Sequence, residues 1–486
     1  MSSLPKSPEI TKLDVVVVGA GISGINIAYR IKKDLPYLTF QVLEARSAIG
    51  GTWDLYRYPG VRSDSDISTL GFSWHPWPFD RFLATGDEIL EYLRSAVSKN
   101  HLDRHIRFGH RVLSADWSTD DRSWMLSVAC GDTRPILISS RWIILSTGYF
   151  DYETPLQQDI PGLDNFKGSI IKPQFWPLDM DYTGKKVALI GSGATAISIL
   201  PKLHDRAAQV TMIQRSPTYV VPCTNTTWTQ RYFPKQCLNT CRRAYYMVVL
   251  YLVVVACRYY PNVVRKVLRA EVARLLPTEI DFDRHFKPRY NPWEQRICLD
   301  PDGAFYKSLH LSNVNIVTGV IDSIGGHEIR MKDGSHISAD IIIIATGIRM
   351  QLGGKIELCS DGKPMSWQKR YVWNGAMLDS VPNMMFMFGY TNNAWTLGAD
   401  NTAMIFIRLY RYMRKKAMKS AVARPSPEAI TGAQRLWQLS ATYVLSAEYQ
   451  LPVYGMAGNW KPRICPPIDY LRARWGDYTS DLDFSD

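Results

Sequence analysis

Two glycine motifs, each directly behind an apolar run, constrain the fold of this 486-residue chain more than any other feature. The first apolar run covers residues 13–18, and glycines follow it in the spacing GxGxxG at Gly19, Gly21 and Gly24. A helical pattern comes next and residues 39–43 read as a second strand, so the segment predicts a β-α-β unit. In such a unit the first glycine permits a tight turn, the second admits a pyrophosphate, and the third packs helix on strand.

A second copy of this unit begins at Lys185 with the apolar strand KKVALI. Ala196 takes the place of the third glycine, which the fingerprint tolerates. The residues of this motif that we expect to contact a dinucleotide are Gly191, Gly193, Ala194 and Thr195. Two copies of a nucleotide-binding unit predict an α/β chain with two Rossmann-like dinucleotide-binding domains.

The residue near the end of each second strand distinguishes the two sites. Glu44 lies 20 residues after Gly24, where a carboxylate accepts hydrogen bonds from ribose hydroxyls. The corresponding residue of the second unit is Arg215, 19 residues after Ala196, and Ser216 follows it. A carboxylate at this position would repel a 2′-phosphate, whereas an arginine can hold one. The first site therefore suits FAD and the second suits NADPH.

Two further apolar strands end in a small residue, a threonine and a glycine, at residues 142–148 and 341–347. Ligands bind at the carboxyl ends of strands in a doubly wound sheet, so Thr346 and Gly347 are candidate cofactor-binding residues. The repetition suggests that one domain is split, with the other inserted between its halves. We expect a first part of the FAD-binding domain over 1–160, an NADPH-binding domain over 161–335 with a helical insertion at about 223–290, and a second part of the FAD-binding domain with the C-terminal region over 336–486.

The chain carries 57 Lys and Arg against 45 Asp and Glu, a formal net charge of +12. Nucleic acid, an anionic membrane or phosphate-bearing cofactors could balance this excess. No basic run interleaved with aromatic residues resembles a nucleic-acid groove, so we expect no nucleic-acid partner. Eight cysteines without a CxxC pair or zinc-ligand spacing indicate a reducing, intracellular compartment and no metal site. The polar N-terminus lacks a signal-peptide core, which favours a cytoplasmic location.

Residues 244–257 form an uncharged apolar segment flanked by Arg242, Arg243 and Arg258. A membrane-spanning helix needs about 20 apolar residues, so this segment is too short to cross a bilayer. We expect a buried helix first. The alternative is a helix lying on a membrane surface, because arginine and tyrosine border the segment, and the protein would then associate peripherally with a membrane.

A third block follows the first β-α-β unit, with glycines at 50 and 51, a tryptophan at 53 and an acid at 64. Glycines and a tryptophan behind the ribose-binding acid suit a loop that closes over a flat ring. The candidate residues on this flavin side are Gly51, Thr52, Trp53 and Asp64.

The run GGTWDLYRYPGVRSD at residues 50–64 resembles the extended flavin-side motif of Baeyer–Villiger monooxygenases, a family of class B flavoprotein monooxygenases. The resemblance extends along nearly the whole chain, and within the family it points to the ethionamide-activating members through IGSGATA, QRSPTYV and NPWEQR. A second stretch is similar to the family's linker fingerprint FxGxxxHxxxWP, through Phe166, Gly168, Lys172, Trp176 and Pro177.

The resemblance implies an FAD- and NADPH-dependent monooxygenase that acts on a small organic molecule. NADPH reduces the flavin, O₂ adds at its C4a atom, and the resulting peroxide inserts one oxygen atom into a ketone to give an ester or lactone. Arg296 in NPWEQR corresponds to the family's catalytic arginine, which stabilises the peroxide, and Asp64 corresponds to the acid that orients it. S- or N-oxidation by the same flavin hydroperoxide is the alternative function.

Two positions depart from the family pattern. Lys172 stands where the linker fingerprint has His, so an acceptor and a near-neutral pKa are lost, and Gln295 stands where many relatives have Lys. A pyridine-nucleotide disulfide reductase would share the fold but needs a redox cysteine pair soon after the first unit, and no cysteine precedes Cys130. A membrane-associated binding protein without activity is the remaining rival, which bound flavin and NADPH-dependent O₂ uptake would exclude.

Overall fold

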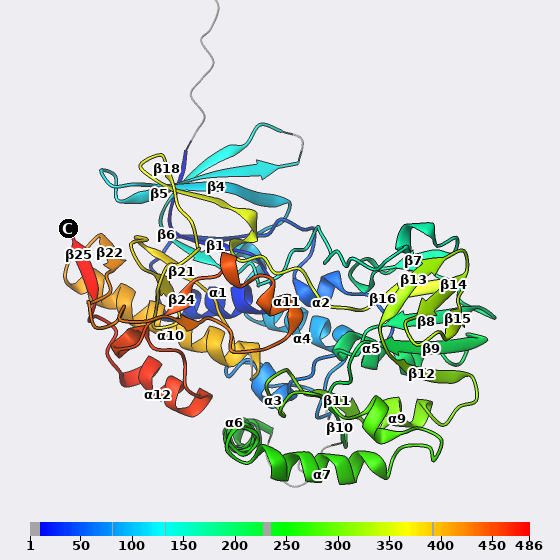
Figure 1. The fold of residues 1–486 in the computed structure, drawn as a ribbon. Helices are drawn as coiled ribbons and strands as arrows, with labels where there is room; N and C mark the ends of the chain where they lie inside the picture. The colour runs from blue at the N-terminus through cyan, green and yellow to red at the C-terminus, as the bar shows by residue number, and fades with distance from the viewer. Residues whose placement is uncertain (1–9, 80, 132, 227–234, 391–392) are drawn as a thin grey trace, which may run out of the picture.

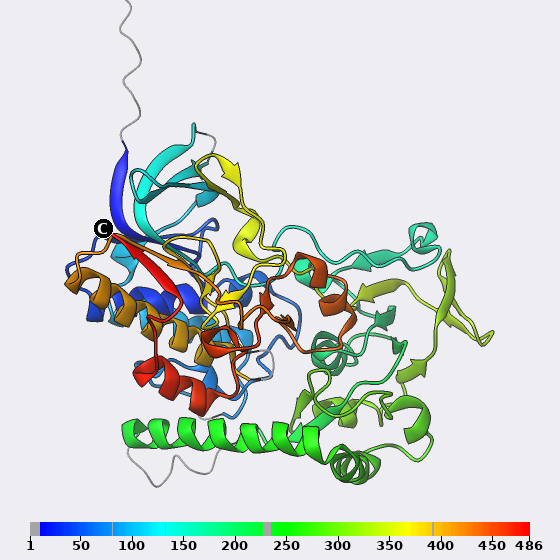
Figure 2. The ribbon, with the colours of Figure 1, turned by 60° about the vertical axis from the view of Figure 1, so that its left-hand side comes forward.

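The computed structural model describes residues 10–79, 81–131, 133–226, 235–390 and 393–486. Two separate sheets organise the chain, and they lie beside one another in both views of the molecule (Figure 1, Figure 2). The chain leaves the first sheet after β6 (Ile136–Leu145), builds the second, and returns with β17 (Glu357–Ser360) and β21 (Met384–Phe386). The fold is therefore α/β with two Rossmann-like units, the second nested within the first, as the sequence predicted.

The first sheet has β1 (Thr11–Val18) at the centre of its parallel part. Val16 of β1 lies opposite Gln41 of β2 (Phe40–Leu43) on one side and Ile143 of β6 on the other. Antiparallel hairpins extend the sheet beyond β6. The other strands of this sheet are β3 (Ile106–Arg107), β4 (His110–Ser118), β5 (Ser123–Cys130) and β18 (Lys363–Pro364).

Three helices cover one face of this sheet: α1 (Ile22–Asp34), α4 (Gly86–Lys99) and α10 (Trp395–Lys415). Alternate residues of β1 serve the two faces, because Val15 and Val17 pack among these helices while Val16 and Val18 join the core on the opposite face. Helix α4 begins with a capping box. The side chain of Thr85 accepts a hydrogen bond from the backbone N–H of Glu88, and the side chain of Glu88 accepts one from the backbone N–H of Thr85.

The second sheet is entirely parallel, in the order β12 (Val314–Thr318), β9 (Gln209–Gln214), β8 (Lys186–Ile190), β16 (Ile341–Ile344) and β7 (Ser169–Ile171). The position of β16 corrects the expected domain boundary at 335/336. Ile342 pairs with Ala188 of β8 and Ile170 of β7, so this strand belongs to the second sheet. Four buried isoleucines suit a central strand of either sheet, and apolarity alone does not say which one.

Three helices lie between β10 (Val220–Cys223) and β11 (Cys298–Pro301): α6 (Lys235–Tyr259), α7 (Pro261–Ala273) and α8 (Phe282–His285). The expectation of a short, buried helix at 244–257 is wrong. Residues Asn239–Tyr259 form a stretch of 21 residues that is long and apolar enough to cross a membrane. Of its most apolar 18 residues, only 11% are buried. An uncharged run predicts burial or lipid contact equally well, and it does not report what packs on it.

The remaining elements are short. A three-stranded sheet extends the second unit, and small helices and hairpins complete the C-terminal region. They are α2 (Thr52–Leu55), α3 (Ile67–Leu70), α5 (Ala194–Ile199), α9 (Ala304–Ser308), α11 (Thr442–Leu445), α12 (Pro466–Trp475), β13 (Ile321–Gly325), β14 (Glu328–Met331), β15 (His336–Ser338), β19 (Val372–Trp373), β20 (Met377–Leu378), β22 (Ser420–Ala423), β23 (Gln434–Arg435), β24 (Val453–Tyr454) and β25 (Leu482–Ser485).

Candidate active site

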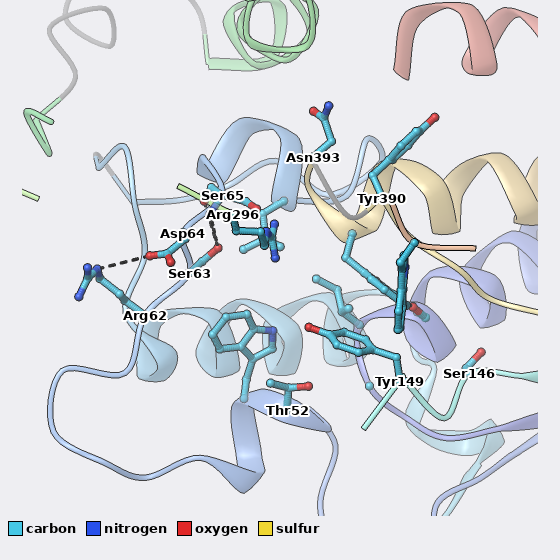
Figure 3. Close-up of a pocket in the computed structure, with 18 of the residues that line it drawn as sticks. Thr52, Arg62, Ser63, Asp64, Ser65, Ser146, Tyr149, Arg296, Tyr390 and Asn393 are labelled. Atoms are coloured by element: carbon cyan, nitrogen blue, oxygen red, sulfur yellow. Dashed lines mark hydrogen bonds and ion pairs between the residues drawn. The ribbon is translucent and has the colours of Figure 1, made fainter. Parts of the chain in front are cut away.

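A cavity of about 260 Å³ opens at the carboxyl ends of β1 and β6. Segments far apart in the sequence form its wall, and Figure 3 shows their side chains around one space. The wall comprises the loop after β1, the α2 region, the loop 62–65, the loop after β6, the segment around Arg296, and aromatic residues of the C-terminal region. Of the predicted residues, the cavity collects Gly21, Thr52, Trp53, Asp64 and Arg296.

The first glycine motif divides into structural positions and one open position. Gly19 has φ +100°, and a Cβ there would lie 2.7 Å from the carbonyl oxygen of Ser146. A Cβ on Gly24 would lie 1.9 Å from the carbonyl oxygen of Gly19, so this residue lets α1 pack against the turn. A Cβ on Gly21 would meet nothing closer than Gly51 Cα at 3.7 Å. Gly21 therefore leaves space in which a ligand can lie close to the backbone.

Glu44 lies at the end of β2, beside the glycine turn. Its carboxylate accepts hydrogen bonds from the backbone N–H groups of Ala20 at 2.6 Å and Arg46 at 2.9 Å. Burial raises the pKa of this carboxyl group, and the two backbone donors partly offset the rise. Glu44 does not line the cavity, so its contact with a ribose stays a prediction.

Five buried polar atoms of residues that line the cavity have no hydrogen-bond partner within the described part of the chain. They are Arg62 Nε, Asp64 Oδ1, Ser146 Oγ, Asn393 Oδ1 and Trp437 Nε1. An unpaired buried polar atom costs about 1–3 kcal/mol, so such atoms in one cavity indicate a polar ligand. Together with the open space at Gly21, they fit a large cofactor that carries hydrogen-bonding groups.

Asp64 lies between two arginines in the view of Figure 3. Its Oδ1 is 3.8 Å from Nε of Arg62, and Arg296 lines the same cavity. Burial raises the pKa of the Asp64 carboxyl group, and the charges of Arg62 and then Arg296 lower it. The arrangement holds an acid and two cations at one wall of the cavity.

Arg62 was not predicted from the sequence, although it lies in the same motif as Asp64. Its guanidinium donates to Ser198 Oγ at 2.6 Å and to the carbonyl oxygen of Leu299 at 2.5 Å. Both acceptors belong to the second nucleotide-binding half of the molecule. The signal that could have identified this residue is its place two positions before the predicted acid.

The second glycine motif repeats the division seen in the first. Gly191 has φ +137°, and a Cβ there would lie 2.2 Å from the carbonyl oxygen of Ala345. No atom lies within 4 Å of a Cβ built on Gly193, and Ala194 beside it is exposed. Thr195 forms a side-chain hydrogen bond with Tyr58, whose pKa burial raises to about 12.

The exposed guanidinium of Arg215 projects at the end of β9, where its Nη2 donates to Thr442 Oγ1 at 3.2 Å. The carbonyl oxygen of Ser216 accepts a hydrogen bond from Ser192 at 3.0 Å, which ties this segment to the glycine loop. Thr346 and Gly347 follow β16, so they lie at the carboxyl end of the second sheet.

The residues of the linker fingerprint lie around β7 of the second sheet, and none of them lines the cavity. Phe166 is buried, and a Cβ on Gly168 would lie 2.1 Å from the carbonyl oxygen of Asp340. Trp176 packs against the core of the second sheet, while Pro177 is exposed. Lys172 is half-buried and directly precedes the turn 173–175.

A second cavity of about 340 Å³ adjoins the first. The two share Tyr390, Trp437 and Leu439, so aromatic and aliphatic side chains separate them. Val254 and Cys257 of α6 form part of the outer wall of the second cavity. This cavity can hold a small organic molecule next to a ligand in the first.

Comparison with known proteins identifies the class. Residues 11–253 match the family of flavin-binding monooxygenase-like proteins. The FAD-containing monooxygenase EthA of Mycolicibacterium smegmatis is 39% identical over 92% of this chain and 92% of its own. The "Probable FAD-binding monooxygenase AlmA" of an Acinetobacter species is 38% identical over 93% of this chain and 91% of its own.

Solved structures share the fold. A steroid monooxygenase bound to NADP superimposes with a TM-score of 0.78 at 22% identity, covering 98% of this chain and 100% of the other. The enzyme OTEMO in complex with FAD and NADP gives a TM-score of 0.75 at 20% identity, covering 99% and 100%. The chain thus belongs to the flavin-binding monooxygenase-like family, and it is a flavoprotein monooxygenase, as its sequence motifs predicted.

Proposed function

We propose that this enzyme performs a Baeyer–Villiger oxidation, in which one oxygen atom of O₂ is inserted into a ketone to give an ester or lactone. The observation that carries the proposal is that Arg296, Asp64 and Gly21 of the first glycine loop line one cavity. The cofactors are FAD and NADPH. When bound, FAD reduced by NADPH supplies the activated oxygen, so the protein must bind, orient, stabilise charge and exclude water.

FAD belongs in the first site. The backbone at Gly21 leaves room for a pyrophosphate, and the N-terminus of the 13-residue helix α1 provides partial positive charge there. Ser146 Oγ and Asn393 Oδ1 are available to hydrogen-bond the cofactor. Gly51, with φ +55° and ψ −116°, places the loop of Thr52 and Trp53 against the same space.

NADPH belongs in the second site. The open space at Gly193 permits close approach of a pyrophosphate. Arg215 is exposed at the end of the second strand, where it can bind a 2′-phosphate in two parallel hydrogen bonds. Ser216 extends the same edge, and Thr346 and Gly347 border it from β16.

Arg296 acts on the reacting atoms through its fixed charge. The positive charge of its guanidinium stabilises negative charge on the reacting oxygens and disfavours proton uptake there. Asp64 is the counter-charge that holds the arginine toward the cavity: burial raises the pKa of its carboxyl group, and the charge of Arg296 acts in the opposite direction. Removal of one such stabilising donor typically lowers the rate of an enzyme about 10²–10³-fold.

Aromatic side chains exclude water from the reacting atoms. Tyr149 stacks on Trp395 with ring centroids 4.9 Å apart, and Trp437 meets Tyr149 edge-on at 5.3 Å. All three line the first cavity. Such a wall protects charged reacting groups from solvent.

The test compares Arg296→Ala with Arg289→Ala, an exposed arginine from the same stretch that lines neither cavity. We expect Arg296→Ala to be reduced by NADPH at the wild-type rate and to lose oxygenation about 10²–10³-fold, with hydrogen peroxide formed instead. Arg289→Ala should behave as wild type. Full oxygenation by Arg296→Ala would refute the role of the arginine. Products from cyclic ketones and thioethers decide the reaction type: sulfoxides without esters would replace this proposal by S-oxidation.

A further inference from the structure

The outer face of α6 is apolar and uncovered. Tyr245, Val248, Leu252 and Tyr259 are spaced three, four and seven residues apart, so they share one side of the helix. Their exposed fractions are 62%, 47%, 57% and 69%. Monomeric soluble proteins rarely leave so long an apolar stripe in water, which indicates that another apolar phase covers it.

The next helix extends this surface. Val263 and Val267 are one turn apart on α7, and both are more than half exposed. Tyr260 joins them at the junction of the two helices. Figure 1 shows α6 end-on and α7 lengthwise, Figure 2 shows the reverse, and both place the pair along the lower edge of the molecule. The two helices therefore lie along one edge of the molecule, and we call their exposed apolar side chains the α6–α7 face.

Positive charge accompanies the apolar side chains. Between residues 239 and 274 the chain has seven Lys and Arg and a single Glu. Arg242 and Arg243 are turned toward the body of the protein, and the other five are exposed. Arg258 and Lys266 are exposed beside the apolar stripes. A second copy of the chain would bring like charges together on this face, whereas an anionic lipid surface complements them. Tyrosines at the rim suit the headgroup level of a bilayer.

The helix lies along the body of the protein and does not cross a bilayer. Arg243 donates to the carbonyl oxygens of Ser68, Thr69 and Gly71, the last at 2.6 Å. Cys257, near the other end of α6, is buried. A spanning orientation would strip these contacts from a buried arginine, so only the outer face is available to lipid.

We propose that the α6–α7 face docks on an anionic bilayer surface and that apolar substrates pass from the bilayer into the second cavity. Val254, Cys257 and Arg258 line that cavity, so the helix that meets the lipid is also part of the cavity wall. Tyr390 and Trp437 form the wall that this cavity shares with the first one. The docking stands independently, and the substrate route rests on the function proposed above.

The docking test uses the flavin-loaded enzyme with vesicles of phosphatidylcholine alone or mixed with phosphatidylglycerol. We expect co-sedimentation with the anionic vesicles, and the double variant Val248→Glu/Leu252→Glu should bind them at least about tenfold more weakly. The matched control is Leu113→Glu/Ile136→Glu, two side chains of similar exposure on the first sheet. Wild-type protein that stays in the supernatant, or a double variant that binds like wild type, overturns the docking. A double variant that elutes from a sizing column as a smaller species than wild type shows instead that a second copy covers this face.

The route is tested by kinetics. A ketone with a long alkyl chain, supplied in anionic vesicles, should show a KM for wild type about tenfold or more below that for Val248→Glu/Leu252→Glu, with equal kcat. A water-soluble cyclic ketone without vesicles should be oxidised equally by both. Equal KM values for the vesicle-borne ketone overturn the route. Wild type that binds vesicles but oxygenates neither ketone refutes the proposed function and the route, and leaves the docking intact.

Discussion

Asp64 is an acid whose position favours function over stability. Among the described residues its Oδ1 has no hydrogen-bond partner, and Arg62 Nε lies 3.8 Å away. Burial raises the pKa of its carboxyl group above the usual 3.8, so the charged form is less stable in this site than in water, although the two arginines partly offset that cost. A charged carboxylate at this place can interact with the two arginines and with a ligand bound between them.

The sign of this shift gives a prediction for Asp64→Asn. A carboxyl group with a raised pKa contributes stability below its unfolded pKa and loses that contribution as the pH rises through its folded pKa. We therefore expect the melting temperature of Asp64→Asn, relative to wild type, to increase with pH from about pH 4 upward. Oxygenation should fall in the same variant because Arg296 loses its counter-charge. Melting curves over a pH series measure the first effect, and a difference in melting temperature that stays constant or falls as the pH rises would contradict it.

Arg215 gives a second prediction at the scale of one residue. Charge-assisted hydrogen bonds to a 2′-phosphate are worth about 1.5–3 kcal/mol, so Arg215→Ala should raise the KM for NADPH about tenfold to a hundredfold. The KM for NADH should change little, since NADH has no 2′-phosphate. Thr442→Val is the control, because this variant loses the hydrogen bond between Arg215 and Thr442 but keeps the charge of Arg215. Equal changes for the two nucleotides would contradict the assignment.

At the scale of elements, the glycine turns separate packing from ligand binding. A Cβ at Gly24 would overlap the carbonyl of Gly19, whereas a Cβ at Gly21 would meet only ordinary contacts. We expect Gly24→Ala to lower the stability of the protein by about 1–3 kcal/mol or more. Gly21→Ala should fold like the flavin-free wild type but retain little FAD. Thermal melts with flavin content, measured by fluorescence after denaturation, distinguish the two. Gly193→Ala is the control, and it should keep its FAD.

Sequence patterns predicted these turns because a glycine spacing directly reports backbone geometry. They were less informative where an apolar run was the only signal. The isoleucines of β16 gave no indication of which sheet they join, and the valines of α6 gave no indication that one side remains uncovered. Burial depends on partners that come from elsewhere in the chain, and hydrophobicity alone does not name them.

Arg62 shows the same limit within the site. Its neighbour Asp64 could be predicted from the motif, but the two acceptors of Arg62 lie more than a hundred residues away. Contacts of this kind appear only when the two halves are assembled. The sequence therefore predicted the glycine turns, and the structure brings the predicted residues Asp64 and Arg296 to one cavity. The sequence missed Arg62, which links that cavity to the second domain.

At the scale of the whole molecule, the two nucleotide-binding halves are joined by polar contacts and by the packing of Tyr58 on the core of the second half. Gly60 of the first half allows its loop to approach α5, because a Cβ there would lie 2.3 Å from the carbonyl oxygen of Ser198. Arg62 binds the same residue through its hydroxyl group. Arg215 reaches across to Thr442 of the C-terminal region. A shift of one half against the other would thus move the Asp64 wall of the cavity.

This arrangement predicts that Arg62 couples NADPH consumption to oxygenation. Arg62→Ala removes its bonds to Ser198 and Leu299, which should loosen the second half against the cavity and let water reach the reacting atoms. We expect the fraction of NADPH that ends as hydrogen peroxide to rise severalfold, while FAD content stays near wild type because the glycine loop is unchanged.

The matched control is Arg57→Ala, since the ion pairs of Arg57 with described residues, Asp54 and Asp87, lie within the first half. Arg62→Lys keeps the positive charge but loses the planar guanidinium that donates to two acceptors at once. The product yield per NADPH of this variant should therefore fall between those of Arg62→Ala and wild type. Product yield per NADPH at equal flavin loading is the measurement, and an Arg62→Ala enzyme as tightly coupled as Arg57→Ala would show that the link between the halves has no part in protecting the reaction.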